Sequence, residues 1–324
     1  MSARGGRTLA EAAAGALPTI APVSAAARRV FLTGLALAVA GSVLFSAKAI
    51  VVKLAYLYGV DTETLLALRM LLALPFFALA LWWTSRDAVP LAGRDHLLLL
   101  AIGVLGYYAA SYLDFLGLQY ISAALERLIL YLNPTLVLLL SVAVLGRIAT
   151  RFDLLALLLS YGGIVLVFWH DVRIEAEGVA LGATLVFGAT VCYASYLVLS
   201  GEIVRRVGAI RLTAYAMCVA TAAVFAQFLL LRPLGSLAQP APVLWLSLIN
   251  AVLCTVLPVF ATMMAVARIG AGSVALAGMV GPISTIALGY VFLGEAISGW
   301  QLTGTAFVLA GVFVLSRKAG LVNK

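Results

Sequence analysis

Ten apolar runs, separated by short polar connections, constrain this chain more than any other feature. A helix needs about 20 mostly apolar residues to cross the ~30 Å hydrocarbon core of a bilayer, and most of the runs approach or exceed that length. None of them alternates apolar with polar residues as the strands of a membrane barrel do. We therefore predict an all-α integral membrane protein with ten transmembrane helices. The runs are 30–58, 64–84, 97–116, 121–145, 154–169, 179–200, 212–231, 243–266, 273–293 and 301–315.

Composition excludes the main alternatives to a membrane protein. Of the 324 residues, 64% are hydrophobic and 10% are charged, whereas a soluble domain averages roughly 25% charged residues. This excludes a soluble enzyme and a disordered protein. The formal charge of +8 is scattered between the runs, so no nucleic-acid partner is predicted.

Residues that carry catalysis or bind metals are scarce. The three cysteines lie inside apolar runs, where we interpret them as small core residues. The two histidines lie at run boundaries, and no metal, nucleophile or phosphate-binding motif occurs. We expect no enzyme activity, no cofactor and no metal.

The distribution of basic residues predicts the orientation. If the first run starts inside, fifteen of the 21 Lys and Arg residues fall in inner segments, and two, Arg173 and Arg232, fall in outer loops. By the positive-inside rule, both termini are cytoplasmic and the protein is a multi-pass protein of the inner (plasma) membrane. Residues 1–29 lack a sustained apolar run and are interpreted as a disordered cytoplasmic tail, with residues 318–324 as a second cytoplasmic tail.

The two halves of the chain align without gaps at an offset of 148 residues. Pro, Gly and Leu-Gly positions coincide at this offset across almost the whole unit, so chance similarity of apolar helices is a poor explanation. Each unit, 30–170 and 171–317, has five runs, and an odd number places the second unit upside down relative to the first. Such inverted repeats recur in secondary transporters. The coinciding positions are Gly34 and Gly182, Ile121 and Ile269, Ala123 and Ala271, Pro134 and Pro282, Leu145-Gly146 and Leu293-Gly294, and Gly163 and Gly311.

Three segments resemble a known family. They read GLQYISAALERLILYLNPT at 117–135, ALAGMVGPIS at 275–284 and LGEAISGWQ at 293–301. Over about residues 30–317 the chain resembles the EamA branch of the drug/metabolite transporter superfamily. The Leu-Gly-Glu mark of that family is intact at its second occurrence, but Arg147 stands in the place of Glu at the first. The resemblance implies a ten-helix carrier with a central pathway between its halves, often an exporter of amino acids or other small metabolites.

Six charged residues lie inside the predicted spans, where each costs about 2.5–3.5 kcal/mol at mid-helix on insertion scales. All belong to the first half and to one outer layer, and the second half has uncharged residues at the equivalent positions of Asp114, Glu126 and Arg127. Two interpretations stay open. The side chains either reach the outer interface or pair to fix helix packing, or they form an outer gate. The excess positive charge of such a gate would attract an anionic substrate group or hold a closed, salt-bridged lid. Lys48 is the deepest and favours a functional role. The six are Lys48, Lys53, Arg69, Asp114, Glu126 and Arg127.

The fourth span brings polar residues and a proline to mid-depth. Glu126 and Asn133 share one helical face, and Arg127, Tyr131 and Pro134 share the next. A proline removes one intrahelical hydrogen bond and frees a carbonyl upstream, and Pro282 does so at the equivalent place. The two helices weakened by these prolines either form part of the wall of a substrate site, or the prolines only bend the helices to fit their neighbours. The predicted substrate pathway comprises Lys48, Glu126, Arg127, Tyr131, Asn133, Pro134, Tyr108, Tyr112, Asn250, Pro282 and Ser284.

These patterns together predict a secondary transporter that exports a small polar metabolite, such as an amino acid, by alternating access between the two repeats. Drug efflux, metabolite uptake and a non-transport membrane protein are the alternatives. No ATP-hydrolysing domain is present in the sequence, so uphill transport would draw on a gradient. The expected partners are a small-molecule substrate and the lipid bilayer, and a homodimer is compatible with the sequence.

Overall fold

The computed structural model describes residues 25–86, 91, 93–145, 150–174 and 178–322. These residues contain no β-strand. They include nine helices long and apolar enough to cross a membrane, and a shorter apolar helix at Gly299–Val314. The first half consists of α2 (Ala25–Tyr56), α3 (Thr62–Ser85), α4 (Gly93–Gly103), η1 (Val104–Ala109), α5 (Ala110–Gly117), α6 (Ala123–Leu130), α7 (Asn133–Leu145) and α8 (Arg151–Ile174). The second half consists of α9 (Val179–Val207), α10 (Ala209–Leu231), η2 (Leu234–Leu237), α11 (Ala241–Ala251), η3 (Val252–Val256), α12 (Leu257–Gly278), α13 (Val280–Leu288), η4 (Gly289–Leu293) and α14 (Gly299–Val322).

Both predicted tails are partly helical in the structure. Helix α2 begins at Ala25, inside the segment 1–29 that the sequence predicts to be disordered, because three successive alanines favour helix. Helix α14 continues to Val322 and so includes five residues of the predicted tail 318–324. The remainder of both tails, residues 1–24 and 323–324, lies outside the described residues.

The helices break just before the two equivalent prolines. Helix α6 ends at Leu130 and α7 begins at Asn133, while α12 ends at Gly278 and α13 begins at Val280. Pro282 has no N–H to bond the carbonyl of Gly278. That carbonyl instead accepts hydrogen bonds from Ser42 Oγ (2.9 Å) and from the Tyr131 hydroxyl, both in the first half. Side chains of the first repeat therefore bond the carbonyl that this break in the second repeat leaves without an intrahelical partner.

A π-helix interrupts a second pair of equivalent spans. η1 starts at Val104 and η3 starts at Val252, again 148 residues apart. Single π turns inside α-helices occur frequently at functional sites. The two repeats thus share a local irregularity that hydropathy does not predict.

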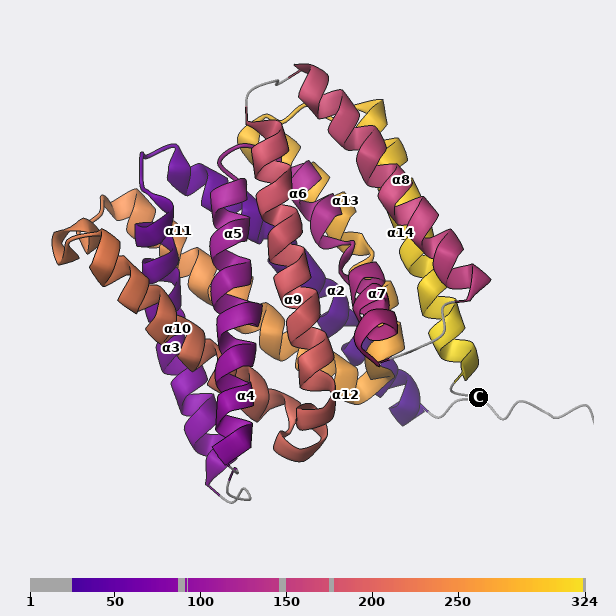
Figure 1. Cartoon of the computed structure of the whole chain (residues 1–324), viewed down its shortest axis with the longest axis horizontal. Coiled ribbons are helices and arrows are strands. Elements are labelled where there is room, and N and C mark those ends of the chain that lie inside the picture. The colour runs from indigo at the N-terminus through magenta and orange to yellow at the C-terminus, as the bar shows by residue number, and fades with distance from the viewer. Residues whose placement is uncertain (1–24, 87–90, 92, 146–149, 175–177, 323–324) are drawn as a thin grey trace, which may run out of the picture.

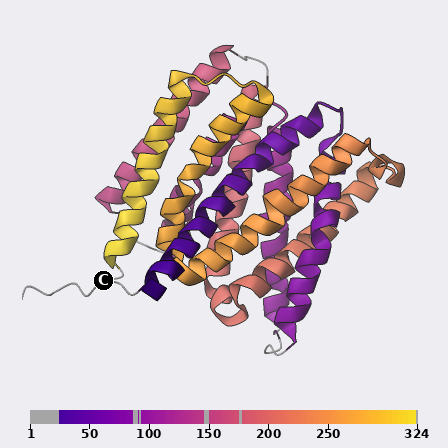
Figure 2. The same ribbon diagram turned by 180° about the vertical axis from the view of Figure 1, so that it is seen from behind.

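The first helix of each repeat packs against the other repeat. Helix α2 contacts α11, α12 and α13, and α9 contacts α4–α7. Figure 2 shows α2 (indigo) running between orange and yellow-orange helices of the second half. A Cβ on Gly34 would lie 2.5 Å from Ile269 Cγ2, and one on Gly182 would lie 2.8 Å from Ile121 Cγ2. Gly182 is the equivalent of Gly34, and Ile269 is the equivalent of Ile121. The same glycine–isoleucine contact therefore occurs twice, with the two repeats exchanged.

The last helices of the repeats, α8 and α14, lie side by side and antiparallel (Figure 1). Gly163 approaches the Gly304 carbonyl so closely that a Cβ on it would lie 2.6 Å from the oxygen. Gly311 approaches the Ala156 carbonyl in the equivalent way, with a distance of 2.8 Å. Each of these contacts occurs a second time with the two repeats exchanged. This indicates a pseudo-two-fold axis that relates two oppositely directed units.

Candidate functional site

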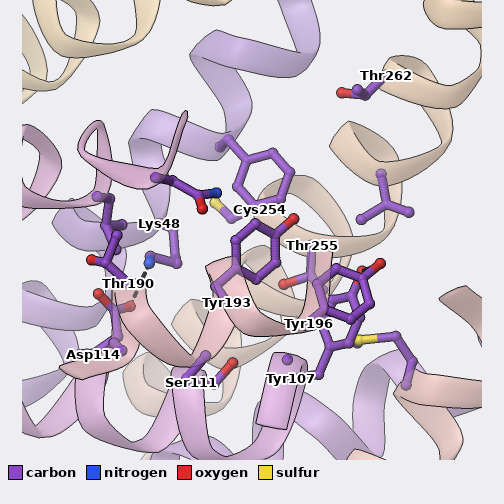
Figure 3. Close-up of a pocket in the computed structure, with 18 of the residues that line it drawn as sticks. Lys48, Tyr107, Ser111, Asp114, Thr190, Tyr193, Tyr196, Cys254, Thr255 and Thr262 are labelled. Atoms are coloured by element: carbon purple, nitrogen blue, oxygen red, sulfur yellow. Dashed lines mark hydrogen bonds and ion pairs between the residues drawn. The ribbon is translucent and has the colours of Figure 1, made fainter. Parts of the chain in front are cut away.

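A cavity of about 360 Å³ lies between the two repeats. Its volume is at the small end of the ~300–1,000 Å³ range of small-molecule pockets. Side chains of both halves line it, and Figure 3 shows the labelled residues converging from several helices. The lining residues are Phe45, Lys48, Arg69, Gly106, Tyr107, Ala110, Ser111, Asp114, Arg127, Leu130, Tyr131, Asn133, Ala189, Thr190, Tyr193, Tyr196, Thr213, Met217, Cys254, Thr255, Val259, Thr262 and Met263.

The cavity walls follow the internal repeat. Seven pairs of lining residues stand 148 residues apart, so equivalent positions of the two halves face the same space. The cavity therefore lies on or near the pseudo-two-fold axis. The pairs are Phe45 and Tyr193, Lys48 and Tyr196, Arg69 and Met217, Gly106 and Cys254, Tyr107 and Thr255, Ser111 and Val259, and Asp114 and Thr262.

One side of the cavity carries a buried ion-pair cluster. Lys48 of α2 forms an ion pair with Asp114 of α5, drawn as a dashed line in Figure 3, and a second with Glu126 Oε1 of α6 at 3.0 Å. Glu126 is 1% exposed and does not itself line the cavity. One ammonium group thus neutralises only one of two neighbouring carboxylates.

Two arginines belong to the same side. Arg69 Nη2 donates to Ser111 Oγ at 3.0 Å, and its guanidinium carbon lies 4.8 Å from the centre of the Phe115 ring. The Arg127 guanidinium carbon lies 5.2 Å from the centre of the Tyr131 ring. Aromatic faces attract cations electrostatically, which partly offsets the loss of water around both groups.

The other side of the cavity is built from three tyrosines, Tyr107, Tyr193 and Tyr196. The centre of the Tyr196 ring lies 5.2 Å from that of Tyr107 and 5.3 Å from that of Tyr193. The hydroxyls of Tyr107 and Tyr196 are 3.4 Å apart. In Figure 3 Tyr196 lies away from Asp114 and Lys48, with Tyr193 between them, so the cavity has a charged side around Lys48 and Asp114 and an aromatic side around Tyr196.

Near the charged side, Glu295 connects the repeats. Its Oε1 lies 3.0 Å from Lys53 Nζ and accepts a hydrogen bond from the Ala123 N–H, also at 3.0 Å. Lys53 Nζ donates in addition to the Ile121 carbonyl at 2.9 Å. We call these four residues the Glu295 bridge. Lys53 is therefore paired within the protein, an arrangement compatible both with a packing role and with a closed, salt-bridged gate.

A second charged group lies at the same end of the bundle. Arg232 Nε is 3.2 Å from Asp61 Oδ1, and Arg232 Nη2 is 3.3 Å from Glu63 Oε2. Partial burial alone would raise the pKa of Asp61, but hydrogen bonds from Thr64 and the nearby Arg232 guanidinium outweigh it and bring that pKa below its ordinary value. Asp61 also caps the amino end of α3, so it ties the start of a first-half helix to the second half.

Four of the predicted pathway residues line the cavity: Lys48, Arg127, Tyr131 and Asn133. Glu126 contacts Lys48 from behind the wall. Pro134 and Pro282 stand at the helix breaks rather than in the lining, and Tyr108 packs against the hydrophobic core.

The other three predicted residues lie elsewhere. The Tyr112 hydroxyl donates to Glu63 Oε1 at 3.0 Å, and Ser284 Oγ donates to the Val280 carbonyl of its own helix. Asn250 is fully buried outside the lining, and its side-chain amide has no hydrogen-bond partner among the described residues.

Several lining residues were not among the predicted site residues. The sequence left Arg69 and Asp114 as residues that either reach the interface, pair locally or belong to an outer gate, and the three tyrosines were aromatic candidates near mid-depth that the predicted pathway did not include. The offset of 148 contained the missing signal, because Tyr196 is the equivalent of Lys48 and Thr262 the equivalent of Asp114. Among the described residues, no group of three or more His, Cys, Asp or Glu is placed to hold a metal ion.

Comparisons with known proteins agree with this architecture. The model of the EamA-like transporter family matches residues 32–169 and again residues 180–317, two segments whose starts and ends are 148 residues apart. The uncharacterized transporter YcbK of Bacillus subtilis is 33% identical over 291 residues, covering 86% of this chain and 92% of the relative. An uncharacterized transporter of Archaeoglobus fulgidus is 28% identical and covers 80% of this chain and 88% of its own length.

A solved structure shares the fold. The crystal structure, titled only as that of a protein, superposes with a TM-score of 0.62 at 17% identity and covers 92% of this chain and 99% of its own. At that identity the likeness concerns the fold alone. The two family matches, which together cover most of the chain, assign it: this protein belongs to the EamA-like transporter family.

Proposed function

We propose that this protein is a secondary transporter that exports a small polar metabolite, such as an amino acid, by alternating access between two inverted five-helix repeats. The tenth crossing in this proposal is α14, whose apolar part, Gly299–Val314, is shorter than the other nine spans. Both termini lie in the cytoplasm and the membrane is the inner (plasma) membrane, as the basic residues predict. The protein acts as a carrier and not as an enzyme.

The observation that carries the proposal is the set of seven equivalent pairs around one cavity. In a carrier made of inverted repeats, exchanging the conformations of the two halves converts one open state into the other around a fixed central site. Such an exchange requires that both halves contribute equivalent positions to the site. The two helix breaks, at Tyr131 and Met279, stand at equivalent positions beside that cavity and supply places where the spans can bend.

We propose that the Glu295 bridge is the outer gate of the carrier. In the predicted orientation it joins the repeats at the outer end of the bundle, beyond the charged side of the cavity. A substrate that reaches the cavity in this conformation enters from the cytoplasm. Release to the outside then requires the bridge to separate, which is a local two-state event of the kind that alternating access needs.

Counterflow in reconstituted vesicles tests the proposal. Purified protein is placed in vesicles loaded with unlabelled amino acids, and uptake of each labelled amino acid is followed against protein-free vesicles. We expect saturable, transient accumulation of at least one amino acid. Non-saturating flux without counterflow would indicate a channel. Counterflow limited to cationic drugs would indicate drug efflux, and no flux of any tested solute would count against a transport function.

Sidedness is tested in cells. Thiol labelling of single cysteines placed at position 5 and position 320 is expected to require permeabilisation, whereas a cysteine at position 235, in the loop after α10, is expected to react from outside. Reaction of all three from the same side would contradict the inverted arrangement. Crosslinking in the membrane tests the homodimer that the sequence allows.

A further inference from the structure

Two buried cations of the cavity lack a counter-ion. Arg69 is 5% exposed and Arg127 is 9% exposed, and both line the cavity. The Nε atom of each is buried without a hydrogen-bond partner. Among the residues that the structure describes, no carboxylate lies within ion-pair distance of either guanidinium. Buried charges are normally paired, because leaving a charge both dehydrated and unpaired is costly.

The nearby carboxylates do not supply this charge. Asp114 and Glu126 are both in ion-pair contact with Lys48. Counted formally, these two carboxylates, Lys48 and the two arginines sum to one positive charge. A single negative charge in the cavity would bring the cluster to neutrality.

The chemistry of the unpaired groups specifies the anion. A guanidinium presents a planar fork of N–H donors that matches the two oxygens of a carboxylate, and it stays charged at all physiological pH values. Both arginines keep donors free for such a partner. The orphaned Nε atoms are the donors that a carboxylate held side-on would occupy.

The opposite side of the cavity specifies the rest of the molecule. Tyr107, Tyr193 and Tyr196 offer ring faces and edges for an apolar or aromatic group. The pseudo-two-fold axis relates Lys48 to Tyr196, so these two residues lie on opposite sides of that axis, while Tyr107 comes from the same span as Asp114 but about two helical turns away. A ligand with an anionic end and an apolar end would therefore bind in one direction only.

We infer that the cavity binds a small organic monoanion whose carboxylate lies between Arg69 and Arg127 and whose apolar or aromatic part lies against the three tyrosines. This inference rests on the proposed carrier function and names the substrate class of the same site. The carboxylate supplies the negative charge that the cluster lacks. An ammonium group on the substrate is not required.

The inference is tested with two probes that differ only in charge, 3-phenylpropanoate and 3-phenylpropanamide. Binding of each to the full-length protein in lipid nanodiscs is measured by titration calorimetry. We expect the acid to bind at least about tenfold more tightly than the amide, because hydrogen bonds to charged groups contribute more than neutral ones. Equal affinity of the two probes for the wild-type protein would overturn the inference without any variant.

Variants then locate the anion site. Arg69→Gln and Arg127→Gln are each expected to reduce the preference for the acid about tenfold, and Arg127→Lys is expected to retain part of it. Met217→Leu is the matched control, since Met217 is the equivalent of Arg69 on the wall and carries no charge. It should change the two affinities together and leave their ratio intact. A preference that persists in both glutamine variants, purified as monodisperse protein, would overturn the assignment.

The same probes separate this inference from the carrier proposal. Preference for the acid in nanodiscs without counterflow in vesicles would support the anion site and count against the carrier. Counterflow of a neutral or cationic solute, with no preference for the acid, would support the carrier and overturn the anion site. Absence of both would overturn both.

Discussion

The two walls of the cavity use equivalent backbone positions and opposite chemistry. The first half contributes Lys48, Arg69 and Asp114, and the second half contributes Tyr196, Met217 and Thr262 at the same places. Elsewhere the halves remain alike, because the helix breaks, the π-helices η1 and η3, and the glycine contacts described above recur at the offset. The symmetry therefore belongs to the scaffold, whereas recognition of charge is, on our proposal, one-sided, because the charged lining residues all belong to the first half.

We expect the largest effect from a substitution that removes the central cation of the charged side. Lys48→Ala leaves Asp114 and Glu126 without their common partner, and removing one member of a buried ion pair costs about 3–5 kcal/mol. We expect counterflow, normalised to the amount of protein in the membrane, to fall about a hundredfold or more.

Tyr196→Phe is the matched control at the equivalent position of the other wall. It removes one hydroxyl whose contact with Tyr107 is long, 3.4 Å, so its flux should stay within about tenfold of wild type. Similar losses in both variants would contradict the claim that recognition is one-sided.

The symmetry of the scaffold is tested at the α8–α14 contact. In Gly163→Ala the new Cβ would lie 2.6 Å from the Gly304 carbonyl, and in Gly311→Ala it would lie 2.8 Å from the Ala156 carbonyl. Each should lower the free energy of unfolding by about 1–3 kcal/mol through overpacking, measured by thermal unfolding in detergent. Gly162→Ala, where a Cβ meets nothing within 4 Å, is the control and should be neutral or slightly stabilising. Sensitivity at one of the two glycines alone would show that the repeats are not equivalent here.

A smaller effect is expected at the Glu295 bridge. Glu295→Gln weakens a partly exposed ion pair with Lys53, so the population open to the outside should rise up to roughly fivefold. The reporter is Cys254, which lines the cavity, in a background with Cys192→Ala and Cys218→Ala. Its labelling rate by an impermeant maleimide added outside measures this opening.

Lys53→Gln should have a similar effect to Glu295→Gln, and the double variant should add little to either, since both remove one interaction. Labelling that is unchanged in all three would mean that the bridge does not control access.

The smallest effect concerns pH at Asp61. Because its pKa is lowered in the folded protein, its charge stabilises the fold above the unfolded pKa of about 3.9 and loses that effect as the pH falls through the folded pKa. The melting temperature of wild type should exceed that of Asp61→Asn by a few degrees at pH 6. The difference should shrink as the pH is lowered below about 4 and the carboxylate becomes protonated, and a constant difference would exclude this charge as its cause.

Most of the fold could be predicted from the sequence, because hydropathy and the offset of 148 act along the whole chain. The ends of α2 and α14 could not, since alanine-rich or apolar segments continue a helix past the last residue that a bilayer requires. The three π-helices η1, η3 and η4 were also missed, because a single extra residue per turn leaves no trace in a long apolar run.

The site was predicted less completely because apolar spans have no polar face to fix their rotation. Lys48, Arg127, Tyr131 and Asn133 were found because their polarity or position beside a proline is unusual. Asn250 has the same unusual polarity but lies outside the cavity, while Tyr193 and Tyr196 resemble any aromatic residue in a span. Applying the offset to Lys48 leads directly to Tyr196.

The π-helices have a consequence for the direction in which the following side chains point. Each residue of an α-helix rotates the chain by about 100° around the helix axis. The extra residue in η1 therefore determines the direction in which the later side chains of that span point, including Ser111 and Asp114. Deleting one residue of η1 would rotate those two side chains by about 100° from their present direction, and the same deletion in η3 would rotate Val259 and Thr262. The extra residues in η1 and η3 thus orient the equivalent side chains of both repeats toward the cavity.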